Sequence, residues 1–195
     1  MSSKANAILT RQLEVRKKLW PDVSTEMTWN RTERTGFVTM PRAMPLILHI
    51  MDYLAGKGSP VSSVYLDIWC RTFDESFLQI TKTEEMATYA GFTGQRAVRT
   101  WKERLSKLVH LGFIDIKYGL TKEVQFALII NPYHVIAKSY ANGLVPVEMW
   151  NALMVRCAEI GANDLDDVDE NGDYVEGIKP VSKRKVRLAT KSPKP

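Results

Sequence analysis

Hydrophobic residues recur every three or four positions along much of the chain, which is the spacing of amphipathic helices. Residues 5–20 show this spacing with basic side chains in between, and Pro21 ends the pattern, so we expect a short basic amphipathic helix there. The run that follows Pro45 is apolar on nearly every side and stops at Gly56, which predicts a buried helix with a glycine stop. The polar residues 21–40 show no period and are expected to form a linker.

The middle of the chain predicts two more helices on either side of a short strand. Apolar residues keep helical spacing over 61–73, and the β-prone segment 77–81 follows after a turn. Thr81 and Glu84 have the spacing of a capping box, which predicts that a helix over 84–89 begins there.

A longer helix is predicted over residues 95–111, with Thr93 as its expected cap. Two β-prone segments, 113–117 and 123–130, then flank a turn and predict a two-stranded hairpin. In the second of these strands, apolar residues alternate as in a half-buried strand at Val124, Phe126, Leu128 and Ile130. One or two further helices are expected over 133–160, interrupted near Pro146.

This order of elements is that of a winged helix: helix, helix, strand, helix, tight turn, helix and two-stranded hairpin. The pattern therefore predicts an α+β, mostly helical fold, a winged helix-turn-helix with a short two-stranded wing and extra helices at both ends. We expect three parts: a basic helix with its linker over 1–35, the winged-helix domain over 36–160, and an acidic segment with a flexible basic tail over 161–195.

The overall composition is that of a globular protein, with 45% hydrophobic and 25% charged residues among 195. No uninterrupted apolar run is long enough for a membrane span, and the first residues lack the apolar region of a secretory signal. Cys70 and Cys157 stand far apart, with no second cysteine at metal or redox spacing. We therefore expect a cytoplasmic protein with reduced thiols and no membrane partner.

The charges are unevenly distributed along the chain, whose formal net charge is +5. Residues 160–178 carry seven acidic side chains and no basic one, whereas residues 179–195 carry seven basic side chains and no acidic one. A basic tail of this kind favours a polyanionic partner, most simply nucleic acid.

Residues 84–114 read EEMATYAGFTGQRAVRTWKERLSKLVHLGFI. This segment resembles the helix-turn-helix and first wing strand of bacterial winged-helix proteins, including GntR-type regulators and plasmid replication initiators. The resemblance covers about residues 41–130. It implies double-stranded DNA as the partner, and a role in transcription regulation or in the replication or maintenance of a bacterial mobile element.

The angular positions along the helix over 95–111 support a recognition helix independently of the resemblance. At 100° per residue, one stripe is apolar and consists of Val98, Trp101, Leu105, Leu108 and Val109. The opposite stripe is polar, and near its start we expect base-edge contacts in the major groove from Gln95, Arg96, Arg99 and Thr100. Glu103 opposes DNA binding unless it accepts a hydrogen bond from a cytosine amino group or pairs with Lys107.

Further DNA contacts are expected from flanking residues. Thr93 and Lys107 lie at the two ends of the predicted recognition helix. The wing offers three polar side chains for phosphate or minor-groove contacts, Lys117, Tyr118 and Lys122, although lysines in short hairpins also serve to prevent edge pairing. The tail offers phosphate contacts from Lys183, Arg184, Lys185 and Arg187, or else it is a solubilising end.

Motifs for catalysis or metal binding are incomplete in this sequence. Residues 167–178 match the first half of a calcium loop, but Ile178 stands where the bidentate glutamate belongs, so an acidic turn at Asn171 and Gly172 is the better interpretation. The three histidines belong to no recognised metal motif, and no nucleophile motif is present. We therefore expect no catalytic residue, no metal and no cofactor, and we interpret the chain as a binding protein rather than an enzyme.

The sequence is also compatible with two other functions. The winged helix can serve as a protein-interaction module, or the chain can be an accessory subunit of a larger nucleoprotein assembly that binds DNA without sequence preference. Homodimers and other protein partners are compatible with both. A shallow salt dependence of binding favours the first function, and equal affinity for unrelated DNAs favours the second.

Overall fold

The computed structural model describes residues 3–31, 33–73, 75–120 and 123–175. The chain divides into two compact units, the first ending at Phe37 and the second beginning at Val38. The first unit contains α1 (Ser3–Leu19) and a short 3-10 helix, η1 (Thr25–Met27). Helix α1 ends just before Pro21, which confirms the helix predicted over residues 5–20.

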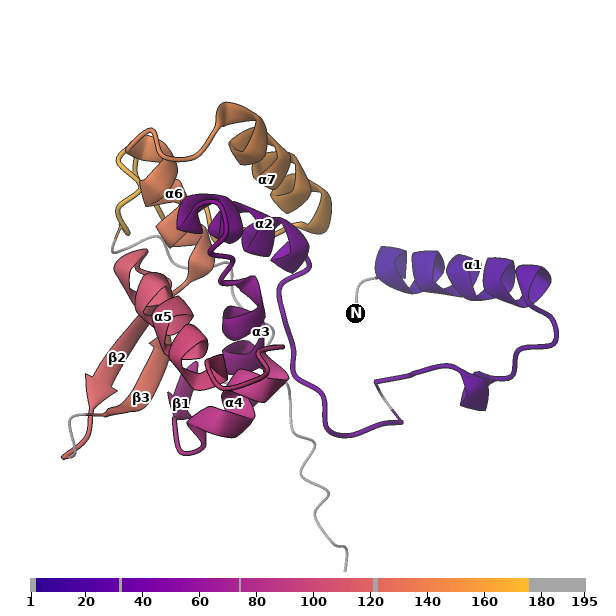
Figure 1. Ribbon diagram of the computed structural model, residues 1–195. Helices are drawn as coiled ribbons and strands as arrows, with labels where there is room; N and C mark the ends of the chain where they lie inside the picture. Colours follow the sequence, from indigo (N-terminus) through magenta and orange to yellow (C-terminus); the bar gives the residue numbers. More distant parts are fainter. Residues whose placement is uncertain (1–2, 32, 74, 121–122, 176–195) are drawn as a thin grey trace, which may run out of the picture. The chain divides into compact units, whose positions relative to one another are not determined.

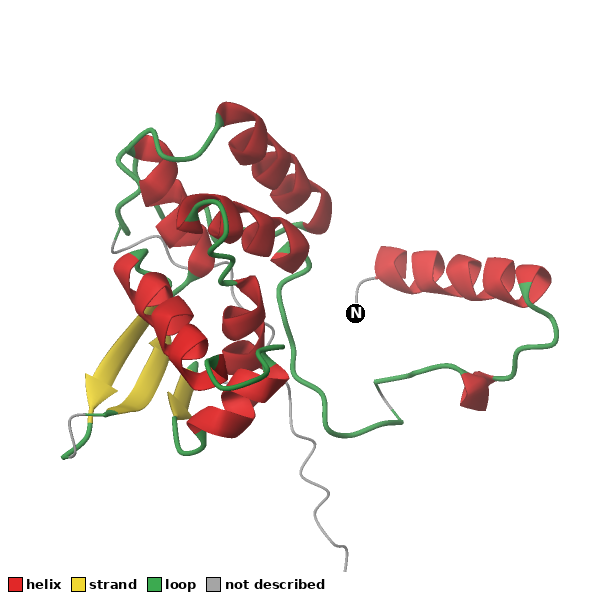
Figure 2. Ribbon diagram, viewed as in Figure 1, coloured by secondary structure: helices red, strands yellow, loops and turns green. Residues whose placement is uncertain are grey.

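The second unit consists of helices gathered around a small sheet (Figures 1 and 2). Its helices in chain order are α2 (Met44–Ala55), α3 (Ser62–Arg71), α4 (Thr83–Tyr89), α5 (Ala97–His110), α6 (Pro132–Ala141) and α7 (Val147–Ile160). Its strands are β1 (Phe77–Gln79), β2 (Ile114–Tyr118) and β3 (Val124–Ile129). The protein is therefore α+β, with seven α-helices and one antiparallel sheet among the described residues.

The core of this unit is formed by buried side chains of α2, α3 and α5 together with those of the sheet and of α6 and α7. Its largest fully buried side chains include Trp101, Tyr65, Phe113, Met44 and Ile47. Helix α3 packs against α2, α4 and α5, and α5 also contacts β2. At roughly 25 cal/mol per Å² of buried apolar surface, packing of this kind is the main favourable contribution to folding. It holds α5 rigidly beside β2.

The sheet has three strands in the order β1, β3, β2, with antiparallel neighbours. The predicted hairpin of β2 and β3 is present. Strand β1 pairs with the free edge of β3, where Leu78 lies opposite Ala127. The sheet therefore has one strand more than the predicted two-stranded wing. The sequence alone does not reveal this pairing, because β1 and β3 are separated by two helices and one strand.

The predicted alternation of β3 is wrong toward its end. Ala127 and Ile129 are buried, whereas Leu128 is exposed. Phe126 shares the outer face with Leu128 and stacks on Phe77 of β1, with ring centroids 5.6 Å apart. Residues 126–130 are all apolar, so the spacing could not distinguish the two faces of the strand.

Both predicted helix caps are also wrong, by one and by three residues. Helix α4 begins at Thr83, so Lys82 rather than Thr81 is its N-cap, and no side chain caps the helix. Helix α5 begins at Ala97 after a turn in which the Ala97 amide donates to the carbonyl of Gly94, so Arg96 occupies the cap position instead of Thr93.

The one or two helices predicted over 133–160 are α6 and α7, and the interruption expected near Pro146 is present, with Pro146 as the N-cap of α7. The acidic residues after α7 fold back onto α6. Lys138 forms an ion pair with Asp173, and the Asn131 side-chain amide donates to Asp164 (3.1 Å). This packing holds the described part of the acidic segment against the second unit.

The acidic turn predicted at Asn171 and Gly172 is confirmed. The Asp169 carboxylate accepts hydrogen bonds from the backbone amides of Asn171 and Asp173, both at 2.9 Å. These amides hold the pKa of Asp169 below its usual value. Gly172 has φ +73°, a conformation that favours glycine.

None of the described helices combines the length and the apolar character that crossing a bilayer requires.

Candidate nucleic-acid interface

Helix α5 presents two chemically different faces, as its sequence predicts. Trp101, Leu105 and Leu108 are buried on one face, while Arg96 just before the helix and Arg99 in its first turn are exposed. The buried stripe fixes the rotation of α5 about its own axis. The polar stripe must therefore face away from the core, and 14 residues make this surface about 21 Å long.

The start of α5 is open to solvent. Thr93, Gln95 and Arg96 are all exposed in the turn that leads from α4 into the helix. Gly91 and Gly94 have φ +89° and +80° in this turn, which only glycine adopts at low cost. Arg96 has no hydrogen-bond or ion-pair partner among the described residues, so its guanidinium can bind a ligand without breaking an existing contact.

Arg99 is paired with Glu103 across one helical turn, with Nε and Oε1 2.9 Å apart. Lys107, one of the two alternatives considered for Glu103, is half-buried, and among the described residues Glu103 pairs with Arg99 instead. Both members of the observed pair are largely exposed, at 79% and 53%. An exposed pair of this kind contributes only about 0.2–1 kcal/mol, and a phosphate or a base edge can displace Glu103 at small cost.

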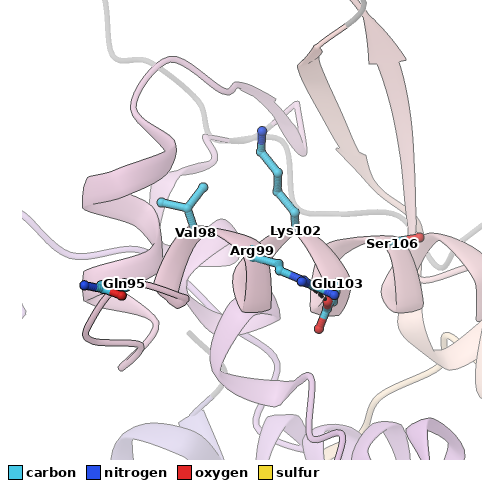
Figure 3. A pocket seen from close by; sticks show the side chains of 6 residues that line it. All are labelled: Gln95, Val98, Arg99, Lys102, Glu103 and Ser106. Atoms are coloured by element: carbon cyan, nitrogen blue, oxygen red, sulfur yellow. Dashed lines mark hydrogen bonds and ion pairs between the residues drawn. The ribbon is translucent and has the colours of Figure 1, made fainter.

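A shallow depression runs along the exposed side of α5 (Figure 3). It is lined by Gln95, Val98, Arg99, Lys102, Glu103 and Ser106. Figure 3 shows Lys102 projecting from the helix while Arg99 turns along it toward Glu103. Lys102 was not among the predicted contact residues, because it lies between the polar and apolar stripes of the helix, and only the neighbouring hairpin makes it a candidate.

The hairpin of β2 and β3 lies beside α5, opposite residues 101–109. Lys102 of α5 and Glu123, just before β3, approach to 3.6 Å, although Glu123 lies far along the chain. The amide of Gly119 donates to the Glu123 carbonyl (2.9 Å), which narrows the hairpin near its tip. A Cβ atom at position 119 would lie 2.5 Å from the Gln125 amide oxygen, the end of a flexible side chain that would have to move away.

Two of the predicted wing residues are exposed on the hairpin. Tyr118 is exposed at the end of β2, and Lys117 forms an ion pair with Asp115 at 2.9 Å. This lysine lowers the pKa of Asp115 through a hydrogen bond to its carboxylate. Lys117 therefore carries a partly compensated charge in the free protein.

Arg104 is a second residue that sequence reasoning missed. Its guanidinium donates to the carbonyl of Gly58 (3.1 Å), linking α5 to the turn after α2. Its Nε is buried with no partner among the described residues, so we assign Arg104 to the support of α5 rather than to its exposed face.

Five of the predicted contact residues lie outside the described residues: Lys122 and the four tail residues Lys183, Arg184, Lys185 and Arg187. The structure brings together Thr93, Gln95, Arg96, Arg99 and, half-buried, Thr100 around the start of α5. Within the part of the chain that the structure describes, no cluster of three or more His, Cys, Asp or Glu side chains has metal-binding geometry.

No protein-family model matches the chain, and no curated protein and no solved structure is significantly similar to it.

Proposed function

We propose that this protein binds duplex DNA, with α5 as the recognition helix in the major groove and the hairpin of β2 and β3 as the wing beside it. The observation that carries the proposal is the exposed, polar start of α5 on a helix whose opposite face is locked into the core. The order of α3, α4, α5 and the hairpin corresponds to a winged helix-turn-helix.

The geometry of the exposed face suits base readout. Arg96 and Gln95 lie at the N-terminal end of α5, which is the end from which recognition helices usually contact base edges. An arginine pairs bidentately with guanine and a glutamine with adenine, and each good pair contributes about 1–3 kcal/mol of discrimination.

The charges near this face favour phosphate contacts. Lys102 lies beside the hairpin and Lys117 lies on it. Each is paired with one exposed carboxylate, Glu123 or Asp115, whose charge is screened by solvent. Glu103 does not prevent DNA binding, because its exposed pair with Arg99 is weak enough to exchange for a phosphate. The biological role implied by the resemblance, transcription regulation or the replication or maintenance of a bacterial mobile element, is part of this proposal.

A matched pair of arginine substitutions tests the proposal. Arg99 on α5 and Arg156 on α7 are each paired with a glutamate on the same helix, to Glu103 and Glu159. A duplex selected from a random library supplies the binding site, and fluorescence anisotropy measures the affinity. We expect Arg99→Ala to weaken binding by about tenfold or more, as loss of a base or phosphate contact does.

Arg156→Ala is the control, because α7 packs against α2 rather than beside the hairpin, and its affinity for the selected duplex should equal that of the wild type. Equal weakening by both substitutions would point to a general charge effect. Unchanged binding by Arg99→Ala, combined with loss of a protein partner, would instead favour the interaction-module alternative and overturn the role of α5.

A further inference from the structure

Helix α1 exposes apolar side chains that no described residue of its own unit buries. Leu13, Val15 and Leu19 are 45%, 48% and 62% exposed. None of the described side chains of this unit, which ends at Phe37, is buried. A lone helix of 17 residues is only marginally stable in water, because most helical stability in proteins comes from packing an apolar face. Helix α1 therefore has the surface of a helix that docks on a partner.

The apolar positions of α1 have the spacing of a coiled-coil seam. The sequence repeats at alternating intervals of three and four residues, through Ala5, Ile8, Gln12, Val15 and Leu19. In a heptad written a to g, these are the a and d positions, which pack against a facing helix. One polar residue among them, Gln12, is compatible with such a seam. The natural complement of this face is another amphipathic helix.

The positions that flank this seam are basic. Arg11 and Lys18 occupy g positions and Arg16 an e position, whereas Glu14, the one acidic residue in the sequence of α1, lies away from the seam. In paired helices, the e and g side chains of one helix face those of the other. Two copies of α1 would therefore place basic side chains opposite basic ones in either orientation, which is destabilising. The charges disfavour a second copy and favour an acidic helix.

A lipid surface fits α1 less well than a helix does. At 100° per residue, Gln12 and Arg16 lie between the seam and a second apolar stripe of Leu13 and Trp20. A helix in the membrane interface buries one apolar face among the lipid tails, where the Arg16 guanidinium would lose its hydration. A partner helix can instead pair Arg16 with a carboxylate. A shallow groove on α1 is lined by Arg11, Gln12, Val15, Arg16 and Trp20.

We propose that α1 binds an acidic amphipathic helix of another protein. Val15 and Leu19 pack into the apolar seam of that helix. Its flanking carboxylates pair with Arg11, Arg16 and Lys18. This interaction uses the first unit alone, so it is independent of the DNA binding that we assign to α5.

Two synthetic peptides test the proposal with the full-length protein. Both contain about three heptads with Leu at the a and d positions, and they carry either Glu or Lys at the e and g positions. Fluorescence anisotropy of each labelled peptide measures its affinity. We expect saturable binding of the Glu peptide, about tenfold or more tighter than that of the Lys peptide and weaker as NaCl is raised. Equal affinity for the two would overturn the acidic partner, and no saturable binding of either would overturn the docking of α1.

Leu13 and Val15 supply matched variants, because they are exposed to a similar extent and lie about 160° apart around α1. Val15→Gln places a polar side chain in the seam and should weaken the Glu peptide by about tenfold, whereas Leu13→Gln should leave its affinity unchanged. Arg16→Gln should weaken binding and flatten its salt dependence. Lys17→Gln removes the same charge opposite the seam and should change neither. Equal loss of affinity in Val15→Gln and Leu13→Gln would overturn the seam, provided that circular dichroism shows unchanged helix content.

The same proteins distinguish the other occupants of this face. Binding to phosphatidylglycerol vesicles, combined with no binding to the Glu peptide, would make α1 a lipid-binding helix and overturn the proposal. A dimer in sedimentation equilibrium that Val15→Gln dissociates would assign the seam to a second copy, with the same consequence. Val15→Gln should bind the selected DNA duplex with wild-type affinity. If the protein binds this duplex and not the Glu peptide, the inference fails and the proposed function stands. If it binds the Glu peptide and no DNA, the reverse holds.

Discussion

Arg96 and Trp101 lie five residues apart and have opposite surroundings, one exposed at the start of α5 and the other buried in the core. Removing the Trp101 side chain leaves a cavity, so Trp101→Ala should lower the free energy of unfolding by about 3–5 kcal/mol. Arg96→Ala removes only exposed atoms and should change it by less than about 0.5 kcal/mol. Urea unfolding followed by circular dichroism measures both.

The same two variants separate stability from recognition. Arg96→Ala should fold normally and lose about 1–3 kcal/mol of specific DNA binding. Trp101→Ala should lose DNA binding only to the extent that it unfolds. A strongly destabilised Arg96→Ala would mean that this residue supports the fold rather than the exposed face.

The two cysteines differ in exposure and so in reactivity. Cys70 is exposed on α3, whereas Cys157 is buried on α7, where burial raises the pKa of its thiol. The thiolate is the reactive form, so raising its pKa lowers the reactive fraction at neutral pH. Mass spectrometry after maleimide labelling of the native protein should find Cys70 modified first and Cys157 protected until urea unfolds the chain. Rapid labelling of Cys157 in the native protein would contradict the packing of α7.

The sequence predicted which side of α5 is buried, but not which residue pairs with Glu103. The spacing of Trp101, Leu105 and Leu108 identified the buried stripe of α5, because a helix has one period and one core-facing side. It did not identify the partner of Glu103, because Arg99 and Lys107 are both one turn away and only the rotation of the helix decides between them.

At the scale of elements, Gly172 allows the acidic segment to lie directly against the backbone of α6. A Cβ atom built at this glycine would lie 2.3 Å from the Lys138 backbone nitrogen, a distance that no relaxed structure tolerates. Gly143 has nearly the same backbone angle, φ +71° against +73°, but nothing within 4 Å of its Cβ position. The two glycines therefore separate the cost of a clash from the cost of backbone strain.

We expect Gly143→Ala to cost about 1–2 kcal/mol, the penalty of a left-handed residue with a side chain. Gly172→Ala should cost more, or should detach residues 164–174 from α6 while the rest of the unit stays folded. Amide hydrogen exchange distinguishes these outcomes, because detachment should lower protection of the hydrogen-bonded Asp169 and Val175 amides and leave the rest of the unit protected. Equal effects of the two substitutions would contradict the close packing at Gly172.

The sequence predicted most helices and strands, but not the N-caps of two helices or the pairing of one strand. The helices over 44–55 and 62–71 match their predicted positions closely, because strong periodicity and a glycine or a turn define them locally, and α6 and α7 lie in the range predicted for one or two helices. The pairing of β1 with β3 was missed, because β pairing between distant segments depends on the tertiary fold.

At the scale of the whole molecule, the distribution of charge along the chain matters more than the net charge. The formal charge of +5 is modest, so long-range attraction to DNA has to come from local basic groups such as those along α5 and the hairpin. The basic tail over 179–195 adds seven positive charges outside the described residues. We expect its deletion to weaken binding to all duplexes alike, as electrophoretic mobility shifts on several unrelated sequences would show.

The most direct test of DNA binding is the dependence of affinity on salt. Each phosphate neutralised by the protein releases counterions and contributes about −0.9 to the slope of log K against log salt concentration. Fluorescence anisotropy of a labelled duplex, titrated with full-length protein from low to moderate NaCl, gives this slope. We predict a straight line with a steep negative slope that becomes shallower by about one unit in Lys102→Ala, which removes a proposed phosphate contact, and stays unchanged in Arg156→Ala. A flat line, or no binding at the lowest salt, would contradict the account.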